Sequence, residues 1–281
     1  MTGSEGAVAG SRRRRGRPLA VLAVSAVVAL ALLLVLPLVG LALRLAPSEI
    51  LIRLARPEVR QALWLSVVTS SAVTLVVVGL GLPAAYVLAT RQFPGKRLLE
   101  ILISLPMVLP PTVSGFALLL AFGRASLGGR MLSVFGVTLP YTTLGVIVAQ
   151  TFMAVPFFIG PARAGFAGVE RRYLEVATTL QADEVYAFWR VVLPLSRASL
   201  LAGASMAWAR ALGEFGATIT FAGNLPGRTQ TMPLAVYLAM QDDLDRAVAL
   251  SLVLVIMAVV LLLGFRHSGF DVFGATRHAS R

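Results

Sequence analysis

QALWLSVVTSSAVTLVVVGLGLPAAYVLAT, residues 61–90, contains no Asp, Glu, Lys or Arg. A helix of about 20 apolar residues crosses the roughly 30 Å hydrocarbon core of a bilayer, so this run is long enough for a membrane span. Further charge-free runs cover residues 18–43, 101–123, 131–162 and 247–265. Because only helices and closed barrels satisfy every backbone polar group in lipid, these long apolar runs predict an all-α, polytopic membrane protein.

The composition of the 281-residue chain argues against a water-soluble enzyme. Charged residues make up 14% and hydrophobic residues 57%, with a mean hydropathy of +0.83, whereas soluble domains carry about 25% charged residues. There is no Cys, and both histidines, His267 and His278, follow the last apolar run. Disulfides and thiolate sites are therefore excluded, and neither a catalytic group nor a metal site is expected.

A sixth span is expected over the less apolar residues 198–222, and the basic residues orient all six. With the N-terminus inside, sixteen Lys and Arg fall on the cytoplasmic side, eight fall outside, and Arg210 lies within a span. The positive-inside rule then predicts a multi-pass protein of the cytoplasmic membrane with both termini in the cytoplasm. The net charge of +12 sets this orientation and contacts lipid headgroups, and nucleic acid is not an expected partner.

The chain divides into four expected parts. Residues 1–17 form a basic cytoplasmic tail, residues 18–43 a peripheral span, residues 60–265 the main membrane domain, and residues 266–281 a cytoplasmic tail. The first span follows an Arg-rich stretch, as the core of a signal peptide does. Its 26 residues exceed the about 7–15 residues of such a core, so we expect the span to be retained.

The only lysine bears on the source of energy. Lys96 follows Gly95, and the phosphate-binding loop G-x-x-x-x-G-K-[ST] would need a glycine where the chain has Thr90. The chain therefore has no such loop, and active transport would draw on an ion gradient or on a separate subunit.

Three prolines fall within six residues of the predicted span 98–122: Pro106, Pro110 and Pro111. Proline breaks the helical hydrogen-bond ladder, which is tolerated at membrane depth where protein or a water-filled cavity covers the backbone. Two interpretations stay open: a kink packed against neighbouring helices, or a mobile segment that lines a pathway.

Arg210 and Glu214 are ionisable residues inside the predicted span 198–222. Charges at mid-membrane normally pair or face a cavity, and residues four apart share a helix face. Small residues such as Gly203 and Ala207 continue that face, which is typical of the inside of a helix bundle. Either this ion pair fixes packing, or Arg210 lines the path of an anion whose charge it partly balances.

Residues 163–197 form a segment of different character, with nine charged residues in 35 positions. We expect them in the cytoplasm as two short helices. Tyr186, Phe188 and Trp189 add large aromatic side chains to this polar loop. Such a face suits docking on a soluble partner, or an interfacial helix whose rings lie among lipid headgroups.

The same loop resembles the cytoplasmic signature of binding-protein-dependent ABC importer permeases, E-A-A-x-x-x-G-x(9)-I-x-L-P. The matching positions are Glu175-Val176-Ala177, Gln181 and Val191-Val192-Leu193-Pro194. Val176 replaces the first Ala, and Gln181 replaces the Gly that permits the turn between two helices. The turn geometry therefore cannot be predicted from the motif.

The resemblance implies that the two helices lie in a cleft of an ATPase subunit. Glu175 would make a charged contact there, and Tyr186, Phe188 and Trp189 would make apolar contacts. Pro194 would be the break that begins the fifth span.

A closer resemblance links four segments to the permease subunits of molybdate importers, which are related to sulfate and tungstate permeases. The segments are residues 93–96, 105–111, 210–218 and 224–229. The resemblance covers roughly residues 60–265 and implies the six-span fold of a type I ABC importer permease. It also implies a second copy of the chain, two ATPase subunits that bind ATP and Mg²⁺, and an extracytoplasmic oxyanion-binding protein. No cofactor would be bound by this chain.

On this interpretation the anion passes weak hydrogen-bond donors, for which the candidates are Arg210, Thr218 and Thr112. The expected pathway also includes Glu214 and the pair Pro110-Pro111. Molybdate, tungstate and sulfate are not distinguished by these residues. An ion-coupled secondary transporter that uses Arg210 and Glu214 as a protonation switch is the alternative from another class, and a membrane enzyme is a third.

Overall fold

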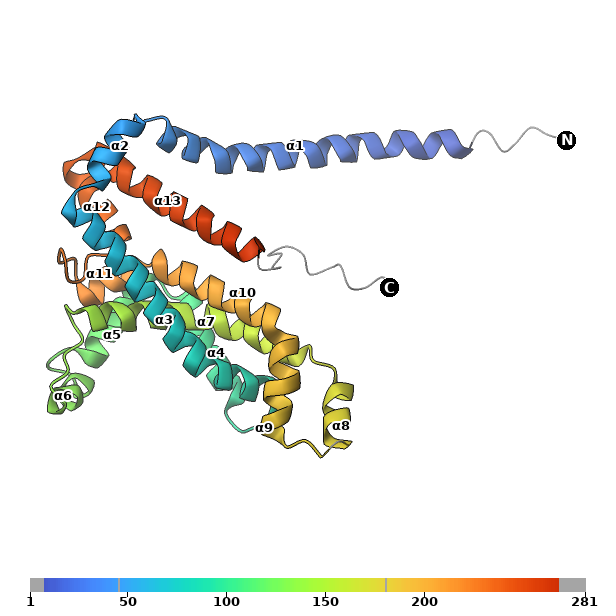
Figure 1. Ribbon diagram of the computed structural model, residues 1–281. Helices are drawn as coiled ribbons and strands as arrows, with labels where there is room; N and C mark the ends of the chain where they lie inside the picture. Colours follow the sequence, from blue (N-terminus) through green and yellow to red (C-terminus); the bar gives the residue numbers. More distant parts are fainter. Residues whose placement is uncertain (1–7, 45, 180, 268–281) are drawn as a thin grey trace. The chain divides into compact units, whose positions relative to one another are not determined.

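The computed structural model describes residues 8–44, 46–179 and 181–267 (Figure 1). All its regular elements over these residues are helical, as expected for the all-α class. The elements are α1 (Val8–Ala42), α2 (Pro47–Leu54), α3 (Pro57–Thr90), α4 (Lys96–Val108), α5 (Pro111–Phe122), α6 (Leu127–Val134), α7 (Thr143–Ala167), α8 (Arg171–Thr179), α9 (Glu184–Ala187), the π-helix η1 (Phe188–Val192), α10 (Leu193–Leu212), α11 (Gly216–Ala222), α12 (Met232–Asp242) and α13 (Leu244–His267). Parts of the two predicted tails, residues 1–7 and 268–281, lie outside the described residues.

The chain separates into two units, Met1–Leu51 and Ile52–Arg281. In the first, the candidate span Val21–Ala42 has a mean hydropathy of 2.9, and none of its most apolar window is buried within the chain. A helix that is apolar on all sides suits a lipid environment. The peripheral role of this span stays a prediction.

The described residues hold five helices long and apolar enough to cross a membrane, or six if the bent pair α5–α6 counts as one span. The upper count agrees with the six predicted spans. In the second unit the single spans lie in α3, α7, α13 and the continuous helical segment Glu184–Leu212. The axes of α5 and α6 meet at 57°.

Two predicted spans are not continuous helices. The span expected over 98–122 divides into α4 and α5 at Leu109 and Pro110, because the adjacent prolines supply no N–H groups and Pro111 is preorganised to begin a helix. The span expected over 198–222 ends at Leu212, and α11 follows after a short link. A further helix, α12, lies within the region expected to be an outer loop.

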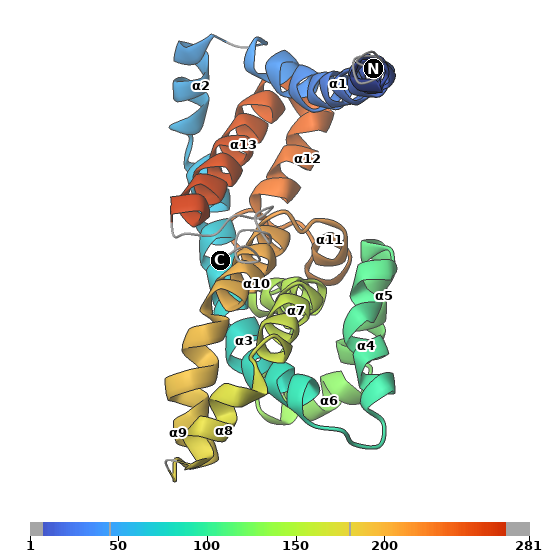
Figure 2. The same ribbon diagram turned by 90° about the vertical axis from the view of Figure 1, so that its right-hand side faces the viewer.

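Helices α3, α7 and α10 form the core of the second unit (Figures 1 and 2). Phe158 of α7 is completely buried, and two glycines on neighbouring helices leave the space that it occupies. A Cβ atom would lie 2.7 Å from the Phe158 ring at Gly81 and 2.9 Å from its carbonyl oxygen at Gly203. Small residues therefore set the close approach of these helices, as membrane helix packing requires.

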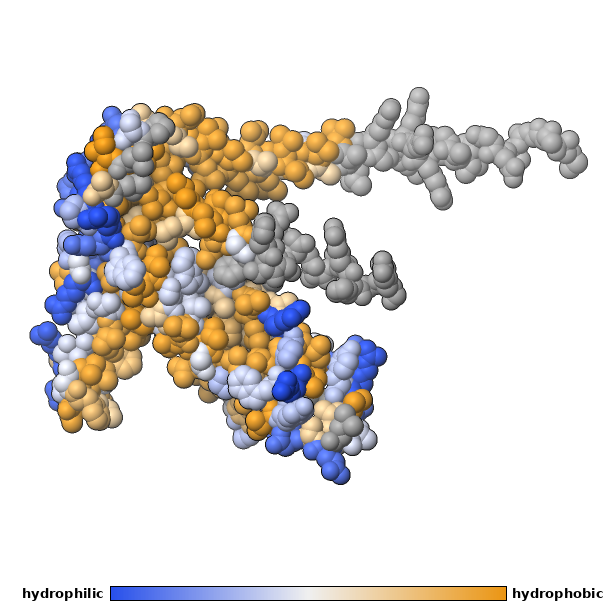
Figure 3. Space-filling model, in the orientation of Figure 1, coloured by the Kyte–Doolittle hydropathy of each residue, from blue (hydrophilic) through white to orange (hydrophobic). Residues whose placement is uncertain are grey.

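The loop between α7 and α10 lies at one end of this core. Its helices α8 and α9 project beyond the ends of α3 and α7 (Figure 1). Hydrophilic side chains gather over α8 and α9, whereas apolar side chains cover the adjoining lengths of α3 and α10 (Figure 3). The candidate spans Thr143–Ala167 and Glu184–Leu212 flank α8, and the location of the whole 163–197 region outside the bilayer stays a prediction.

Candidate functional site

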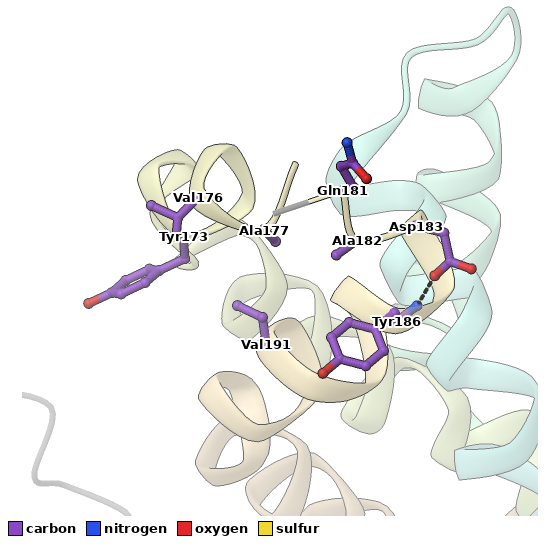
Figure 4. Close-up of a pocket in the computed structure, with 8 residues that line it drawn as sticks. All are labelled: Tyr173, Val176, Ala177, Gln181, Ala182, Asp183, Tyr186 and Val191. Carbon is purple, nitrogen blue, oxygen red and sulfur yellow. Dashed lines mark hydrogen bonds between the residues drawn. The ribbon is translucent and has the colours of Figure 1, made fainter. Parts of the chain in front are cut away.

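An open groove lies between α8 and the α9–η1 segment. Its volume is about 840 Å³, and Figure 4 shows side chains facing it from both helices. The lining residues are Tyr173, Val176, Ala177, Gln181, Ala182, Asp183, Tyr186 and Val191. Four of these, Val176, Ala177, Gln181 and Tyr186, were predicted from the sequence as site residues, and Val191 belongs to the motif. We call this feature the α8–α9 groove.

The turn that closes the groove is built at Gln181. Its φ angle is +58°, in the left-handed region, and the N–H of Ala182 donates to the carbonyl oxygen of Ala177 at 3.0 Å. This bond spans five residues, which identifies a Schellman ending of α8 with Gln181 at the left-handed position. The helix–turn–helix geometry is therefore present although glutamine stands where the motif has glycine. A left-handed non-glycine residue costs about 1–2 kcal/mol.

Asp183 fixes the start of α9. Its Oδ1 atom accepts a hydrogen bond from the Tyr186 N–H at 2.6 Å, so Asp183 is the N-cap. This role was not predicted, although an aspartate directly before a short helical segment is a recognisable signal. Next to it, Glu184 pairs with Arg91 at the end of α3, with an Nη2–Oε2 distance of 3.0 Å. Both side chains are exposed, so the pair contributes little stability.

An aromatic cluster anchors the loop to the bundle. The Phe188 ring lies 4.8 Å from the Tyr86 ring of α3 and 6.1 Å from the Phe166 ring of α7, measured between centroids. Phe188 is thus partly buried inside the chain, in an anchoring role that the sequence did not indicate, and its contact with a partner stays a prediction. Tyr186 and Trp189 remain 57% and 59% exposed and keep their expected place on the surface.

Pro194 lies in the first turn of α10, which begins at Leu193, close to the expected start of the fifth span. The expected break is not a gap in the helix, because α9, η1 and α10 follow one another directly from Glu184 to Leu212. In η1 the hydrogen bonds lengthen by one residue, so that the Leu193 N–H donates to the Phe188 carbonyl oxygen. The π-helix accommodates the missing N–H of Pro194 without ending the helix.

Glu175 is an exposed carboxylate on α8. Its carbonyl oxygen accepts a hydrogen bond from the Thr179 hydroxyl at 2.6 Å. None of the side chains that the structure describes forms an ion pair with the Glu175 carboxylate. Beside it Val176 is 58% exposed, whereas Ala177 is buried. The outer face of α8 thus offers one charge and one apolar side chain to a partner.

The intramembrane pair forms, but not on one continuous helix. Arg210 lies in the last turn of α10, and Glu214 lies in the link before α11, with an Nη1–Oε2 distance of 2.5 Å. The Glu214 carboxylate is completely buried and also accepts the Ala217 N–H at 2.7 Å. Glu214 therefore neutralises Arg210 and caps α11 at the same time. This geometry favours the packing interpretation of the pair.

The other pathway candidates separate into exposed and buried groups. Pro110, Pro111 and Thr112 are exposed at the start of α5, which packs against the start of α11. A Cβ atom at Gly216 would lie 2.7 Å from Cβ of Pro111. Thr218 is completely buried, and its hydroxyl has no hydrogen-bond partner among the residues that the structure describes. Thr112 and Thr218 thus do not line one open surface.

Gln150 of α7 is a buried polar residue that sequence reasoning missed. Its side chain is fully buried, and within the described part of the chain neither amide atom has a hydrogen-bond partner. Such groups are costly unless they serve a function or bind an ordered water. The only signal in the sequence was a lone glutamine within the charge-free run 131–162.

Among the described residues no group of three or more His, Cys, Asp or Glu side chains is placed to hold a metal ion. The α8–α9 groove presents apolar and acidic groups, and the uninterrupted segment Glu184–Leu212 connects it to the Arg210–Glu214 pair.

Comparisons with known proteins agree with this arrangement. The family described as binding-protein-dependent transport system inner membrane component matches residues 78–268. The molybdenum transport system permease protein ModB of Mycobacterium tuberculosis is 45% identical over 233 residues, which cover 82% of this chain and 87% of that protein. ModB of Escherichia coli K12 is 36% identical over 203 residues, covering 72% of this chain and 89% of that protein.

Two solved structures share the fold. A bacterial ABC transporter for import of the polysaccharide alginate superimposes with a TM-score of 0.75 at 14% identity, over 92% of this chain and 96% of that one. The inward-facing MetNI methionine ABC transporter gives a TM-score of 0.57 at 15% identity, over 74% of this chain and 92% of that one. At these identities the likeness concerns the fold alone, and it confirms the predicted importer-permease fold.

Proposed function

The chain belongs to the family of binding-protein-dependent transport system inner membrane components, and from this premise we propose that it is the membrane subunit of an ATP-driven molybdate importer. The observation that carries the proposal is the α8–α9 groove, a preformed and exposed docking feature on a chain without a phosphate-binding loop. Relatives named as molybdenum permeases, at up to 45% identity, support molybdate as the substrate. Tungstate and sulfate are the alternatives within this class.

A separate ATPase subunit would bind the α8–α9 groove. Glu175 would supply a charged contact, and Val176, Tyr186 and Trp189 would supply apolar contacts, since aromatic side chains dominate many interfaces. ATP and Mg²⁺ would bind to that subunit, and ATP would be hydrolysed there. The role of this chain is then conformational and non-catalytic.

Two features would transmit movement from the groove into the membrane. The segment Glu184–Leu212 contains 29 residues and stays helical through η1, where it changes direction (Figure 1). The aromatic cluster of Tyr86, Phe166 and Phe188 fixes the η1 end of this segment to α3 and α7. A displacement of α9 would therefore move α10 as a nearly rigid body and open one side of the pathway while closing the other.

The full assembly would contain two copies of this chain, two ATPase subunits and an extracytoplasmic binding protein that selects the oxyanion. The chain is a multi-pass membrane protein, and we propose that both termini face the cytoplasm, because sixteen basic residues fall on that side and eight on the other. The start of α5, with Pro110, Pro111 and Thr112, is exposed and would face the pathway. Arg210 would contribute through its exposed edge, whereas the buried Glu214 and Thr218 would position α11.

Uptake of labelled molybdate into sealed vesicles tests the proposal. Vesicles that contain this chain, the ATPase and the binding protein should accumulate molybdate only with ATP, and tungstate and sulfate as competitors would define the selectivity. Vesicles with this chain alone and an imposed proton gradient should accumulate none. Robust uptake in the second case would instead establish a secondary transporter.

A further inference from the structure

A second cavity lies between α4 and α7, with a contribution from α3. Its volume is about 410 Å³, and its lining includes Glu100, Ser104 and Arg163. The Arg163 guanidinium pairs with the Glu100 carboxylate at 2.8 Å, and the two side chains are 45% and 28% exposed. Neither the α8–α9 groove nor the Arg210–Glu214 pair includes these residues. We call it the α4–α7 pocket.

Helical spacing explains how the pocket forms. On α4, Glu100, Ser104 and Met107 line it at intervals of four and three residues, and Pro106 is the one buried residue of that helix. On α7, Pro156 and Ile159 line the pocket together with the small residues Gly160, Ala164 and Ala167. The three small residues leave open volume on the α7 side, next to Arg163.

The ion pair is not explained by stability. Partly exposed pairs contribute between about 0 and 1 kcal/mol, because solvent already screens both charges. Since Glu100 and Arg163 remain partly exposed and line the pocket, the guanidinium stays within reach of a solute there.

We propose that the α4–α7 pocket is a low-affinity site for a tetrahedral oxyanion, in which Arg163 binds the anion and Glu100 competes with it. Arginine presents a planar fork of N–H donors that matches an oxyanion, and the Ser104 hydroxyl adds a donor when it leaves the Glu100 carbonyl oxygen, to which it donates at 2.9 Å. A water occupies about 30 Å³, so the volume admits the anion with several waters. The inference rests on the proposed function for the identity of the anion.

The competing carboxylate has a purpose in a transport pathway. An unpaired arginine in a pocket would hold a dianion tightly and delay its release. Because the anion must displace Glu100, its affinity falls, and Glu100 returns to Arg163 as the anion leaves. Glu100 thus promotes release of the anion, and loss of its carboxylate should strengthen anion binding rather than weaken it.

Equilibrium binding of molybdate to the purified full chain in lipid nanodiscs tests this inference. Glu100→Gln should raise the affinity about tenfold, because it removes a competing charge at ion-pair distance. Arg163→Gln should abolish saturable binding, and Arg163→Lys should retain it in part. The matched control is Glu170→Gln, because Glu170 forms an exposed pair with Arg172 at 2.8 Å outside the pocket; it should leave binding unchanged.

The inference is overturned if Glu100→Gln leaves the affinity unchanged or lowers it, or if Arg163→Gln binds as the wild type does. Thermal melting of each variant identifies misfolding, and Arg163→Lys then carries the comparison because it keeps the charge. ATP-driven uptake by the wild-type assembly is measured in parallel. If the wild-type assembly takes up molybdate but the variants bind it as the wild type does, the pocket proposal is refuted and the proposed function stands. If the wild-type assembly shows no uptake, the proposed function is refuted, and the binding measurements alone decide the pocket proposal.

Discussion

At the scale of single residues, Gln181 stores a small conformational cost in the turn between α8 and α9. A left-handed residue with a Cβ atom is strained by about 1–2 kcal/mol, whereas glycine is not, although glycine loses more chain entropy on folding. Gln181→Gly should therefore stabilise the turn by about 0.5–1 kcal/mol, and Gln181→Val should destabilise it.

Hydrogen exchange at the Ala182 amide measures this effect directly, because that N–H closes the turn on the Ala177 carbonyl oxygen. Exchange should slow in Gln181→Gly and accelerate in Gln181→Val. The exposed Gln92, outside the loop, offers Gln92→Gly as a control that should leave the Ala182 amide unchanged. Faster exchange in Gln181→Gly would contradict the assignment of strain to this position.

Asp243 makes the junction between α12 and α13 sensitive to acid. The hydrogen bond from the Arg246 N–H, followed by the ion pair with Arg53, lowers the pKa of this carboxyl. Since the folded pKa lies below the usual value of about 3.9, the stabilisation is complete above that pH and is lost as the pH falls through the folded pKa.

The contribution of the Asp243 carboxyl to the melting temperature in nanodiscs should therefore stay constant with pH near neutrality and be lost below about pH 4. Asp243→Asn should lower the melting temperature at pH 7 and flatten this part of the acid profile. Asp242→Asn, at the exposed neighbour, is the control. An unchanged acid profile in Asp243→Asn would show that other carboxylates determine the response.

At the scale of elements, the loop has an outer face and an anchor, and the two should separate in experiment. Tyr186 is exposed, so Tyr186→Ala should weaken co-purification of the ATPase about tenfold, as truncation of an interfacial aromatic residue does. Phe188 packs on Tyr86 and Phe166, so Phe188→Ala should leave co-purification intact and reduce substrate-stimulated ATP turnover. Equal effects of both variants on co-purification would show that Phe188 also contacts the partner.

The sequence predicted the elements whose signals are local. The two helices of the 163–197 loop followed from charge and motif spacing, and the long spans followed from uninterrupted apolar runs. The breaks at Leu109–Pro110 and at Gly213–Phe215 were harder to predict, because hydropathy measures how apolar a segment is and not where its helical hydrogen bonds end. Pro194 predicted a break between the loop and the fifth span. The longer hydrogen bonds of η1 keep the segment helical there, although Pro194 has no N–H.

Site prediction failed where roles depend on contacts across the fold. In the sequence, Phe188 resembles an aromatic residue of an exposed loop. In the fold it contacts Tyr86 and Phe166, which come from distant segments of the chain. The Glu100–Arg163 pair is equally invisible, because 62 positions separate its members and nothing local links them. Tertiary packing supplies both facts.

At the scale of the whole molecule, the Arg210–Glu214 pair distinguishes an ATP-driven permease from a proton-coupled transporter. Glu214 is buried and caps α11, which makes the pair part of the scaffold. Removal of one partner from a buried pair costs about 3–5 kcal/mol, whereas replacement of both by neutral groups is often tolerated. Glutamine at 214 keeps the oxygen that accepts the Ala217 N–H.

The double variant Arg210→Met with Glu214→Gln should therefore fold and retain ATP-driven molybdate uptake within about threefold of the wild type, since uncharged replacement of both partners is close to neutral. Arg210→Met alone should be less stable, because it leaves the Glu214 carboxylate buried without its cation. Uptake into vesicles of the complete assembly, measured with ATP and with a proton gradient, provides the comparison. If the folded double variant lost all uptake and the wild type responded to the proton gradient, the pair would be a protonation switch, and the energy would come from this chain rather than from an ATPase.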